Sequence, residues 1–248
     1  MEVNKVFIKG DCHGSFEFLD NFCFKANTTK DDILIILGDA GINYNLNMKD
    51  IILKEKIKNY PITLFCIHGN HEERPYNIPS YKEKEMFGGI VYVEDEYPNI
   101  IFAKDGENYK IGGHYYFVLG GAYSVDKNYR LARGWNWFES EQPDDKIKKY
   151  VQEQIRLYDG KFDIILSHTA PLKYEPVEMF LPMIDQSKVD KTTEKWLNKI
   201  EDEIDYNMWY FGHYHGDYCK AEKIRMLFND ILTIDWKAKG DSDKYGNK

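Results

Sequence analysis

The chain has 248 residues, 43% of them hydrophobic, and carries a formal net charge of −8. This length and apolar content predict one folded domain, over residues 1–236, and exclude a disordered chain. No apolar run approaches the roughly 18 residues of a membrane-spanning helix, and the acidic charge argues against binding of extended duplex nucleic acid.

The chain start and the cysteines indicate where the protein works. Met1 to Gly10 has the pattern of a strand and lacks the long apolar stretch of a signal peptide. The four cysteines include no C-x-x-C pair, so neither a disulfide framework nor a thiolate zinc site is expected. We therefore predict a cytoplasmic protein with reduced thiols and no membrane partner.

Five short apolar runs define the main predicted strands, and each ends in a small or polar residue followed by a candidate metal ligand. The runs and their endings are Val3–Ile8 with Gly10-Asp11, Ile33–Leu37 with Gly38-Asp39, Ile62–Ile67 with His68-Gly69-Asn70-His71, Ile164–Leu166 with Ser167-His168, and Met208–Phe211 with Gly212-His213. Runs of this kind are typical of strands buried on both faces. Helical spacing of apolar residues follows the first run, from Phe16 to Ala26, and precedes the fourth, from Ile147 to Tyr158. This alternation predicts a layered α/β fold with functional groups at the carboxyl ends of the strands.

The middle of the chain predicts shorter strands joined by tight turns. They are Gly89–Val93, Ile100–Ala103, Asn108–Ile111 and His114–Leu119, and glycine-containing turns separate the last three. We interpret them as a mixed or antiparallel part that forms a second sheet packed on the first. Residues 120–138 are expected to form a long loop, and residues 237–248 a disordered polar tail.

The residues at the strand ends have the chemistry of metal ligands. Asp11 and His13 alternate along the chain, so an extended backbone directs both side chains to one cation. Asp39 has two carboxylate oxygens with which to bridge two ions, and Asn70 offers a neutral oxygen. Each signal alone is more often a turn or a core histidine, but five of the seven histidines fall at strand ends in chain order. The candidate ligands are Asp11, His13, Asp39, Asn70, His168, His213 and His215.

The three remaining histidine positions differ from these. His71 directly follows Asn70 and is placed to act on a substrate rather than on a metal. His68 is expected to hydrogen-bond behind the ligands or in the core. His114, after a Gly-Gly turn, is expected to be exposed.

The ordered motifs resemble a known family. Gly-Asp-x-His-Gly, Gly-Asp, Gly-Asn-His-Glu, a lone His and Gly-His-x-His are similar to the calcineurin-like metallophosphoesterase superfamily, from Val3 to about Trp236. The resemblance implies an α/β four-layer sandwich, with two mixed β-sheets flanked by α-helices. It also implies one metal held by Asp11, His13, Asp39 and His215, and another held by Asp39, Asn70, His168 and His213.

One departure from the superfamily bears on the substrate. The serine/threonine protein phosphatases follow their second Gly-Asp with Val-Asp-Arg-Gly, whereas Gly38-Asp39 is followed here by Ala40 to Tyr44 without an arginine. The missing phosphate-binding arginine argues against a phosphoprotein phosphatase. The segment from Leu119 to Asp126, with Arg130 and Trp135 after it, resembles microbial and phage members instead.

The expected activity is a phosphodiesterase that acts on a nucleotide or nucleic-acid-type substrate with two divalent metal ions. Manganese is the first choice, and Fe, Zn or Ni are alternatives for this mixed nitrogen and oxygen ligand set. Asp39 and His71 are the catalytic candidates, with Glu72 or Glu73 to orient His71. The alternatives are a phosphomonoesterase on a nucleotide or small phosphorylated metabolite, and an inactive scaffold of the same fold.

Four residues are candidates for substrate binding, namely Arg74, Arg130, Arg133 and Trp135. Arginine binds phosphate oxygens in pairs, and an aromatic face stacks on a base. The competing interpretations are ordinary surface arginines and a loop whose aromatic side chains pack against the second sheet.

Overall fold

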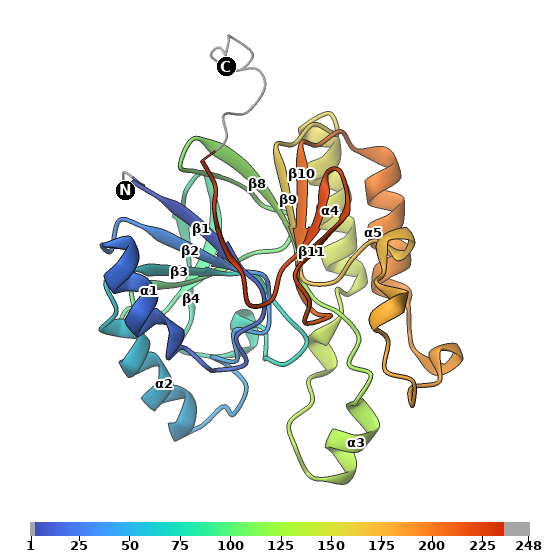
Figure 1. The fold of residues 1–248 in the computed structure, drawn as a ribbon, viewed down its shortest axis with the longest axis horizontal. Coiled ribbons are helices and arrows are strands. Elements are labelled where there is room, and N and C mark those ends of the chain that lie inside the picture. The colour runs from blue at the N-terminus through green and yellow to red at the C-terminus, as the bar shows by residue number, and fades with distance from the viewer. Residues whose placement is uncertain (1–2, 236–248) are drawn as a thin grey trace.

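The computed structural model describes residues 3–235, which form two β-sheets with helices on both outer sides (Figure 1). The predicted four-layer α/β sandwich is therefore confirmed. The predicted tail at 237–248 lies outside the described residues. No helix within residues 3–235 is both long enough and apolar enough to cross a membrane.

The first sheet has seven strands in the order β13-β1-β2-β3-β6-β5-β4. Their bounds are β1 (Val6–Lys9), β2 (Ile33–Ile36), β3 (Thr63–Cys66), β4 (Lys82–Met86), β5 (Gly89–Val93), β6 (Ile100–Ala103) and β13 (Ile231–Thr233). The neighbouring strands β1, β2, β3 and β6 are parallel to one another. β13, β5 and β4 each pair antiparallel with the strand before them or beside them in this order. The sheet is thus mixed, with its parallel strands in the middle.

The second sheet has six strands in the order β11-β12-β10-β9-β8-β7. Their bounds are β7 (Asn108–Ile111), β8 (His114–Leu119), β9 (Ile164–Ser167), β10 (Met208–Phe211), β11 (Tyr218–Ala221) and β12 (Ile224–Met226). β8, β9, β10 and β12 are parallel, and β7 and β11 are antiparallel to their neighbours.

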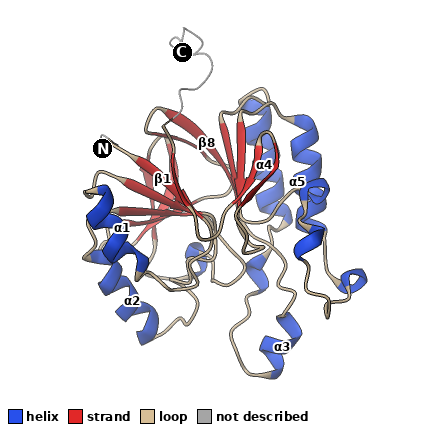
Figure 2. Cartoon of the chain, viewed as in Figure 1, coloured by secondary structure: helices blue, strands red, loops and turns tan. Residues whose placement is uncertain are grey.

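The helices cover the outer faces of the two sheets (Figure 2). The α-helices are α1 (Phe18–Ala26), α2 (Met48–Lys58), α3 (Lys127–Ala132), α4 (Asp145–Leu157) and α5 (Thr192–Glu203). Short 3-10 turns are η1 (Pro75–Asn77), η2 (Glu139–Glu141), η3 (Leu172–Tyr174), η4 (Val177–Met179) and η5 (Gln186–Lys188). α1 and α2 lie on the first sheet, α4 and α5 lie on the second, and α3 stands apart on the 120–138 segment.

Three apolar layers fill the spaces between the four layers of structure. The central layer joins the facing sides of the two sheets, with Ile8 and Ile35 from one and Tyr116 and Leu166 from the other. The alternate residues of the same strands pack against the helices on the outer sides. Burial on both faces is the reason that these strands are continuous apolar runs.

The arrangement of the middle strands differs from the prediction. All four are strands, but β5 and β6 belong to the first sheet, and only β7 and β8 belong to the second. The chain passes from one sheet to the other at the turn around Asp105. β4, with the sequence KEKEM, is an exposed edge strand. Its charged residues do not show the apolar pattern from which the other strands were predicted.

Asp105 ties three loops together where the chain changes sheets. Its Oδ2 accepts a hydrogen bond from Arg74 Nη1 at 2.6 Å, and its Oδ1 accepts one from the Gly120 amide at 2.7 Å. Arg74 Nε in turn donates to the carbonyl of Ser140 at 2.8 Å. Both partners of the ion pair are buried, so neither can regain water if the other is removed.

We predict that Asp105→Asn lowers the free energy of unfolding by about 3–5 kcal/mol, because it leaves the buried Arg74 charge unpaired. Urea denaturation followed by circular dichroism measures the change. Asp95→Asn is the matched control, since Asp95 forms an exposed ion pair with Lys82 that solvent screens. An equal loss in both variants would contradict a structural role for the buried pair.

Candidate metal centre

The loops that follow β1, β2, β3, β9 and β10 bring the predicted ligands together at one edge of the two sheets. Three groups of Asp and His residues place their ligand atoms within 4.8 Å of one another. They are Asp11 with His13 and His215, His13 with Asp39 and His71, and Asp11 with Asp39 and His168. Residues more than 200 positions apart in the chain therefore share one site.

Asp11 and two histidines form the first part of the site. Asp11 Oδ2 lies 3.6 Å from His13 Nε2 and 3.3 Å from His215 Nε2, and the two imidazole nitrogens are 2.9 Å apart. Asp11 Oδ1 accepts the amide hydrogen of His213, but Oδ2 is buried and has no hydrogen bond of normal geometry among the described residues. A buried carboxylate oxygen that faces two imidazole nitrogens fits a divalent cation of borderline hardness.

Asn70 and His168 form the second part. His168 Nδ1 lies 2.7 Å from the carbonyl of Leu37, so Nδ1 carries a ring proton and Nε2 is the nitrogen that can take a second proton or a metal. That Nε2 is 2.8 Å from Asn70 Oδ1. The Asn70 amide is held in this orientation because its Nδ2 donates to Ser124 Oγ at 2.9 Å. Two acceptor atoms at this separation need a proton or a cation between them, and such a pair suits a metal.

Asp39 lies between the two parts and turns one oxygen toward each. Its Oδ1 is 3.5 Å from His168 Nε2, and its Oδ2 is 3.9 Å from His13 Nδ1. Oδ1 also accepts the amide hydrogen of His71 at 2.7 Å. Asp39 therefore lies within reach of residues in both parts, while its role as a bridge between two metals stays a prediction.

The charges of the metal-free site are coupled through His168. Burial lowers the pKa of His168, but the Asp39 carboxylate outweighs burial and raises it to about 9. Burial raises the pKa of Asp39, yet the charge and hydrogen bond of His168 bring it well below its usual range. Burial, followed by the charge of His168, lowers the pKa of His213 to about 3. At neutral pH, Asp39 is therefore ionised and His213 is neutral, the forms that bind cations.

The backbone at the site is held in a sparsely populated conformation. His13, Asp39, His213 and His215 have φ values of 47°, 46°, 67° and 54°. Left-handed φ angles in residues other than glycine cost free energy and concentrate at functional sites. The fold thus forces four of the predicted ligands into strained turns that aim their side chains at one another.

His213 and His71 line the same cavity but hold different places in it. The His213 ring lies edge-on to His168, with ring centroids 5.0 Å apart. His71 lies 5.2 Å from the His13 ring and is stacked at 6.3 Å on Tyr44. His71 is close enough to His13 and Asp39 to count among possible ligands, so the geometry alone admits both a metal and a substrate role for it.

Comparison with known proteins agrees with the site. The family described as calcineurin-like phosphoesterase matches residues 5–217. The chain belongs to the calcineurin-like phosphoesterase family. Membership supports a hydrolase of phosphate esters, and the Asp and His groups supply candidate metal ligands. No match to a curated protein is found. One crystal structure aligns over 93% of this chain and 95% of its own, with 14% identity and a TM-score of 0.49.

Two of the predicted substrate-binding arginines of this phosphoesterase are buried in structural contacts. Arg74 is held by Asp105 and Ser140, as described above, and does not line the cavity at the metal ligands. Arg130 contacts Ser124 Oγ, Asp126 and the carbonyl of Asn136. Neither is a surface arginine, and the substrate-binding role does not fit these positions. Arg130 instead positions Ser124, which orients Asn70.

Arg133 and Trp135 lie on the 120–138 segment outside the cavity. Trp135 is 53% exposed and packs edge-on against Tyr129 at 5.7 Å. The Arg133 guanidinium lies over the same Tyr129 ring at 5.2 Å. Neither residue lines the cavity next to the ligands, and Trp135 does not pack into the second sheet either.

The glutamates after His71 and the two other histidines have structural contacts. Glu72 is fully buried and accepts hydrogen bonds from the amides of Gly41 and Gly69, so it joins two ligand loops rather than orienting His71. Glu73 accepts from Asn77 and Ser140. His68 is buried, but neither of its ring nitrogens makes the expected hydrogen bond with normal geometry among the described residues. His114 is also buried, contrary to expectation.

We predict that Asp39→Asn strips at least one metal and abolishes turnover. The substitution keeps the volume, the acceptor for the His71 amide and a side chain that tolerates left-handed φ, but it removes the charge between the ligands. Metal content by mass spectrometry and the melting-temperature increase on adding Mn²⁺ measure the effect. Two metals per chain with full turnover would contradict the bridging assignment.

We predict that Ser124→Ala weakens metal binding about 10–100-fold, because Asn70 is then free to rotate its oxygen away from His168. Titration of the metal-free protein with Mn²⁺ measures the affinity. Ser15→Ala, an exposed hydroxyl that contacts only Glu17 in this structure, is the control. Unchanged affinity in Ser124→Ala would show that Asn70 is oriented without Ser124.

Proposed function

We propose that the protein is a phosphodiesterase that uses two divalent metal ions and acts on a nucleotide or nucleic-acid-type substrate. The observation that carries this proposal is the placement of Asp39, whose two carboxylate oxygens face separate groups of ligands. One group is Asp11, His13 and His215, and the other contains Asn70 and His168, with the His213 ring beside that of His168. A full ligand set of this kind also argues against an inactive scaffold.

Nitrogen and oxygen ligands without thiolates favour manganese, with Fe, Zn or Ni as alternatives. Two such ions supply Lewis acidity and an activated water for attack on phosphorus. Burial raises the pKa of Asp11 and of Asp39, but neighbouring histidines lower both pKa values by more. Both carboxylates are therefore ionised, the form that binds cations.

His71 is the proposed substrate-facing residue. Burial lowers its pKa, so the ring is neutral near pH 7. A neutral imidazole offers one N–H donor, which can hydrogen-bond to a phosphoryl oxygen or to the departing oxygen of the ester. Its amide is fixed by Asp39, so the side chain starts from a rigid turn beside the metal ligands.

The cavity composition favours a diester over a monoester. The cavity has a volume of about 420 Å³ and, among the described residues, no arginine lines it. Lys191 is the one lining residue there with a permanent positive charge, and its ammonium is paired with Glu175 at 2.6 Å. A monoester dianion would lack the arginine contacts that usually offset its second charge, whereas the singly charged diester does not need them.

The test is hydrolysis of bis(para-nitrophenyl) phosphate and para-nitrophenyl phosphate by the purified protein with added Mn²⁺. We expect the diester to be the better substrate, and a chelator to stop its turnover. Faster hydrolysis of the monoester would support the phosphomonoesterase alternative instead.

We predict that His71→Ala retains both metals but lowers kcat about 10²–10⁴-fold on alkyl esters, the range expected for loss of a proton-transfer group. The loss should be smaller for para-nitrophenyl esters, because nitrophenolate leaves without a proton. Metal analysis and kcat on both esters measure this. Loss of a metal in His71→Ala would make His71 a ligand.

A further inference from the structure

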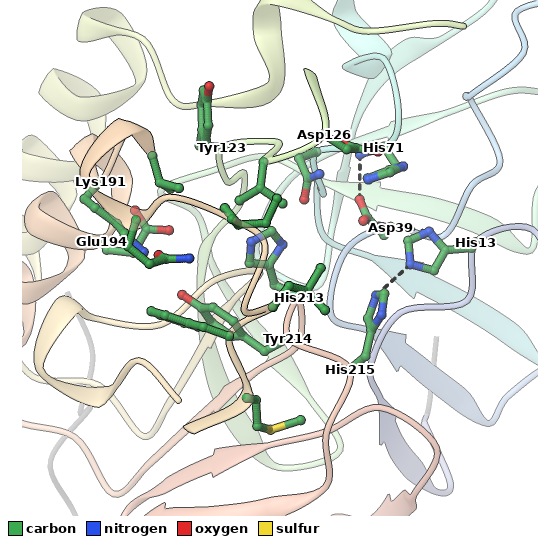
Figure 3. A pocket seen from close by; sticks show the side chains of 18 residues that line it. His13, Asp39, His71, Tyr123, Asp126, Lys191, Glu194, His213, Tyr214 and His215 are labelled. Carbon is green, nitrogen blue, oxygen red and sulfur yellow. Dashed lines mark hydrogen bonds and ion pairs between the residues drawn. The ribbon is translucent and has the colours of Figure 1, made fainter. Parts of the chain in front are cut away.

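The cavity at the metal site extends well beyond the ligands (Figure 3). One half is lined by His13, Asp39 and His71. In the other half Lys191 and Glu194 lie close together, with His213 and Tyr214 between the two halves. We call this second half the distal subsite, and define it by Tyr123, Phe180, Val189, Lys191 and Glu194.

The walls of the distal subsite are largely apolar. Segment 177–189, which begins with η4 and precedes α5, contributes Met179, Phe180, Leu181, Ile184 and Val189 to the lining of the cavity. Phe180 is stacked on Tyr214, with ring centroids 6.1 Å apart and planes 25° from parallel. Walls of this composition accept a flat ring, because aromatic and aliphatic side chains pack against both of its faces.

Glu194 places an unsatisfied acceptor among these apolar groups. Its side chain is 3% exposed, and its Oε1 accepts from Thr169 Oγ1 at 2.9 Å. Thr169 is in turn 2.9 Å from the Tyr214 hydroxyl. This chain of hydrogen bonds fixes the carboxyl group, while Oε2 is buried with no hydrogen-bond partner among the described residues. An unpaired buried acceptor is unfavourable until a ligand supplies a donor.

Lys191 limits which ligand can supply that donor. Its ammonium pairs with Glu175 and lies 4.6 Å from the centre of the Phe180 ring. A quaternary ammonium group has no N–H, so it cannot supply that donor. A plain hydrocarbon would leave Glu194 Oε2 unpaired. A neutral flat ring with an N–H group on its edge packs against the apolar walls and supplies the donor that Glu194 Oε2 lacks. An acceptor atom on the same edge can also accept a hydrogen bond from Lys191.

We propose that the distal subsite binds the nucleobase of the substrate, with the ring against Phe180 and an N–H of its edge donating to Glu194 Oε2. This inference rests on the proposed phosphodiesterase function, because the bound base belongs to a substrate only if the protein hydrolyses nucleotide diesters. The nucleobase is then recognised by Phe180 of segment 177–189 and by Glu194 of α5, and not by Trp135 as the sequence predicted. Glu194 and Phe180 are then the residues that determine specificity, at the opposite end of the cavity from His13.

The kinetic test compares two diesters with the same leaving group, thymidine 5′-para-nitrophenyl phosphate and bis(para-nitrophenyl) phosphate. In Glu194→Gln the amide oxygen keeps the Thr169 hydrogen bond, so the NH₂ group faces the cavity and cannot accept. We expect the ratio of kcat/KM for the thymidine ester to that for the phenyl ester to fall about tenfold, the effect of losing one hydrogen bond to a buried carboxyl group.

Two control variants accompany this measurement. Glu203→Gln makes the same substitution at an exposed position of the same helix and should leave the ratio unchanged. Trp135→Ala tests the competing location for base stacking. A drop in the ratio for Trp135→Ala, with none for Glu194→Gln, would overturn the proposal.

Binding of thymidine itself separates this proposal from the catalytic one, because the nucleoside has no phosphate. We expect calorimetry to show that thymidine binds the wild-type protein and binds Phe180→Leu, which keeps apolar bulk but loses the flat ring, at least several-fold more weakly. This result would support the subsite even if no phosphodiester were hydrolysed. Binding of choline instead of thymidine, or equal binding by both proteins, would overturn it.

Discussion

The buried carboxyl group and backbone of Asp39 fasten together the loops on which the site depends. The Asp39 carbonyl accepts the amides of Cys12 and His13, at 3.0 and 2.7 Å, and its side chain accepts the amide of His71. The loops after β1, β2 and β3 are therefore joined through one residue. Because that residue also faces His168 from the second sheet, its position sets the distance between the two halves of the site.

Close packing around the ligands explains the glycines that precede them. A Cβ added to Gly38 would lie 2.2 Å from His168 Nδ1, and one added to Gly69 would lie 2.1 Å from the Asp39 amide nitrogen. Gly38 also has a φ of 86°, which other residues rarely adopt. The Gly-Asp and Gly-Asn pairs therefore reflect the approach of one loop to another, and the ligands cannot converge without them.

The strands and the ligand positions were predictable because they depend on local patterns. Buried strands such as Ile33–Ile36 are recognisable as continuous apolar runs, and the Asp, Asn and His residues at their ends indicate where the site lies. The division of strands between sheets was not predictable, since β5 and β7 have similar local patterns and differ in their partners. Nor was the distal subsite, because Glu194 is one of 41 acidic residues and only the tertiary fold buries it. The burial of Arg74 and Arg130 was not predictable for the same reason, because burial in ion pairs leaves no trace in the sequence.

The pairing of β13 with β1 has a consequence for how the protein is made. Phe7 lies opposite Thr233, so the first sheet gains strand β13 only after residue 233 has been synthesised. The candidate metal ligands are divided in the same way, with four in residues 11–70 and three in residues 168–215. A growing chain that has completed the first sheet's parallel strands holds Asp11 and Asp39 with His13, but without His168 and His215, whose imidazoles lie closer to the two carboxylates. Completion of the candidate metal site is then a late event in folding, coupled to long-range contacts that form slowly.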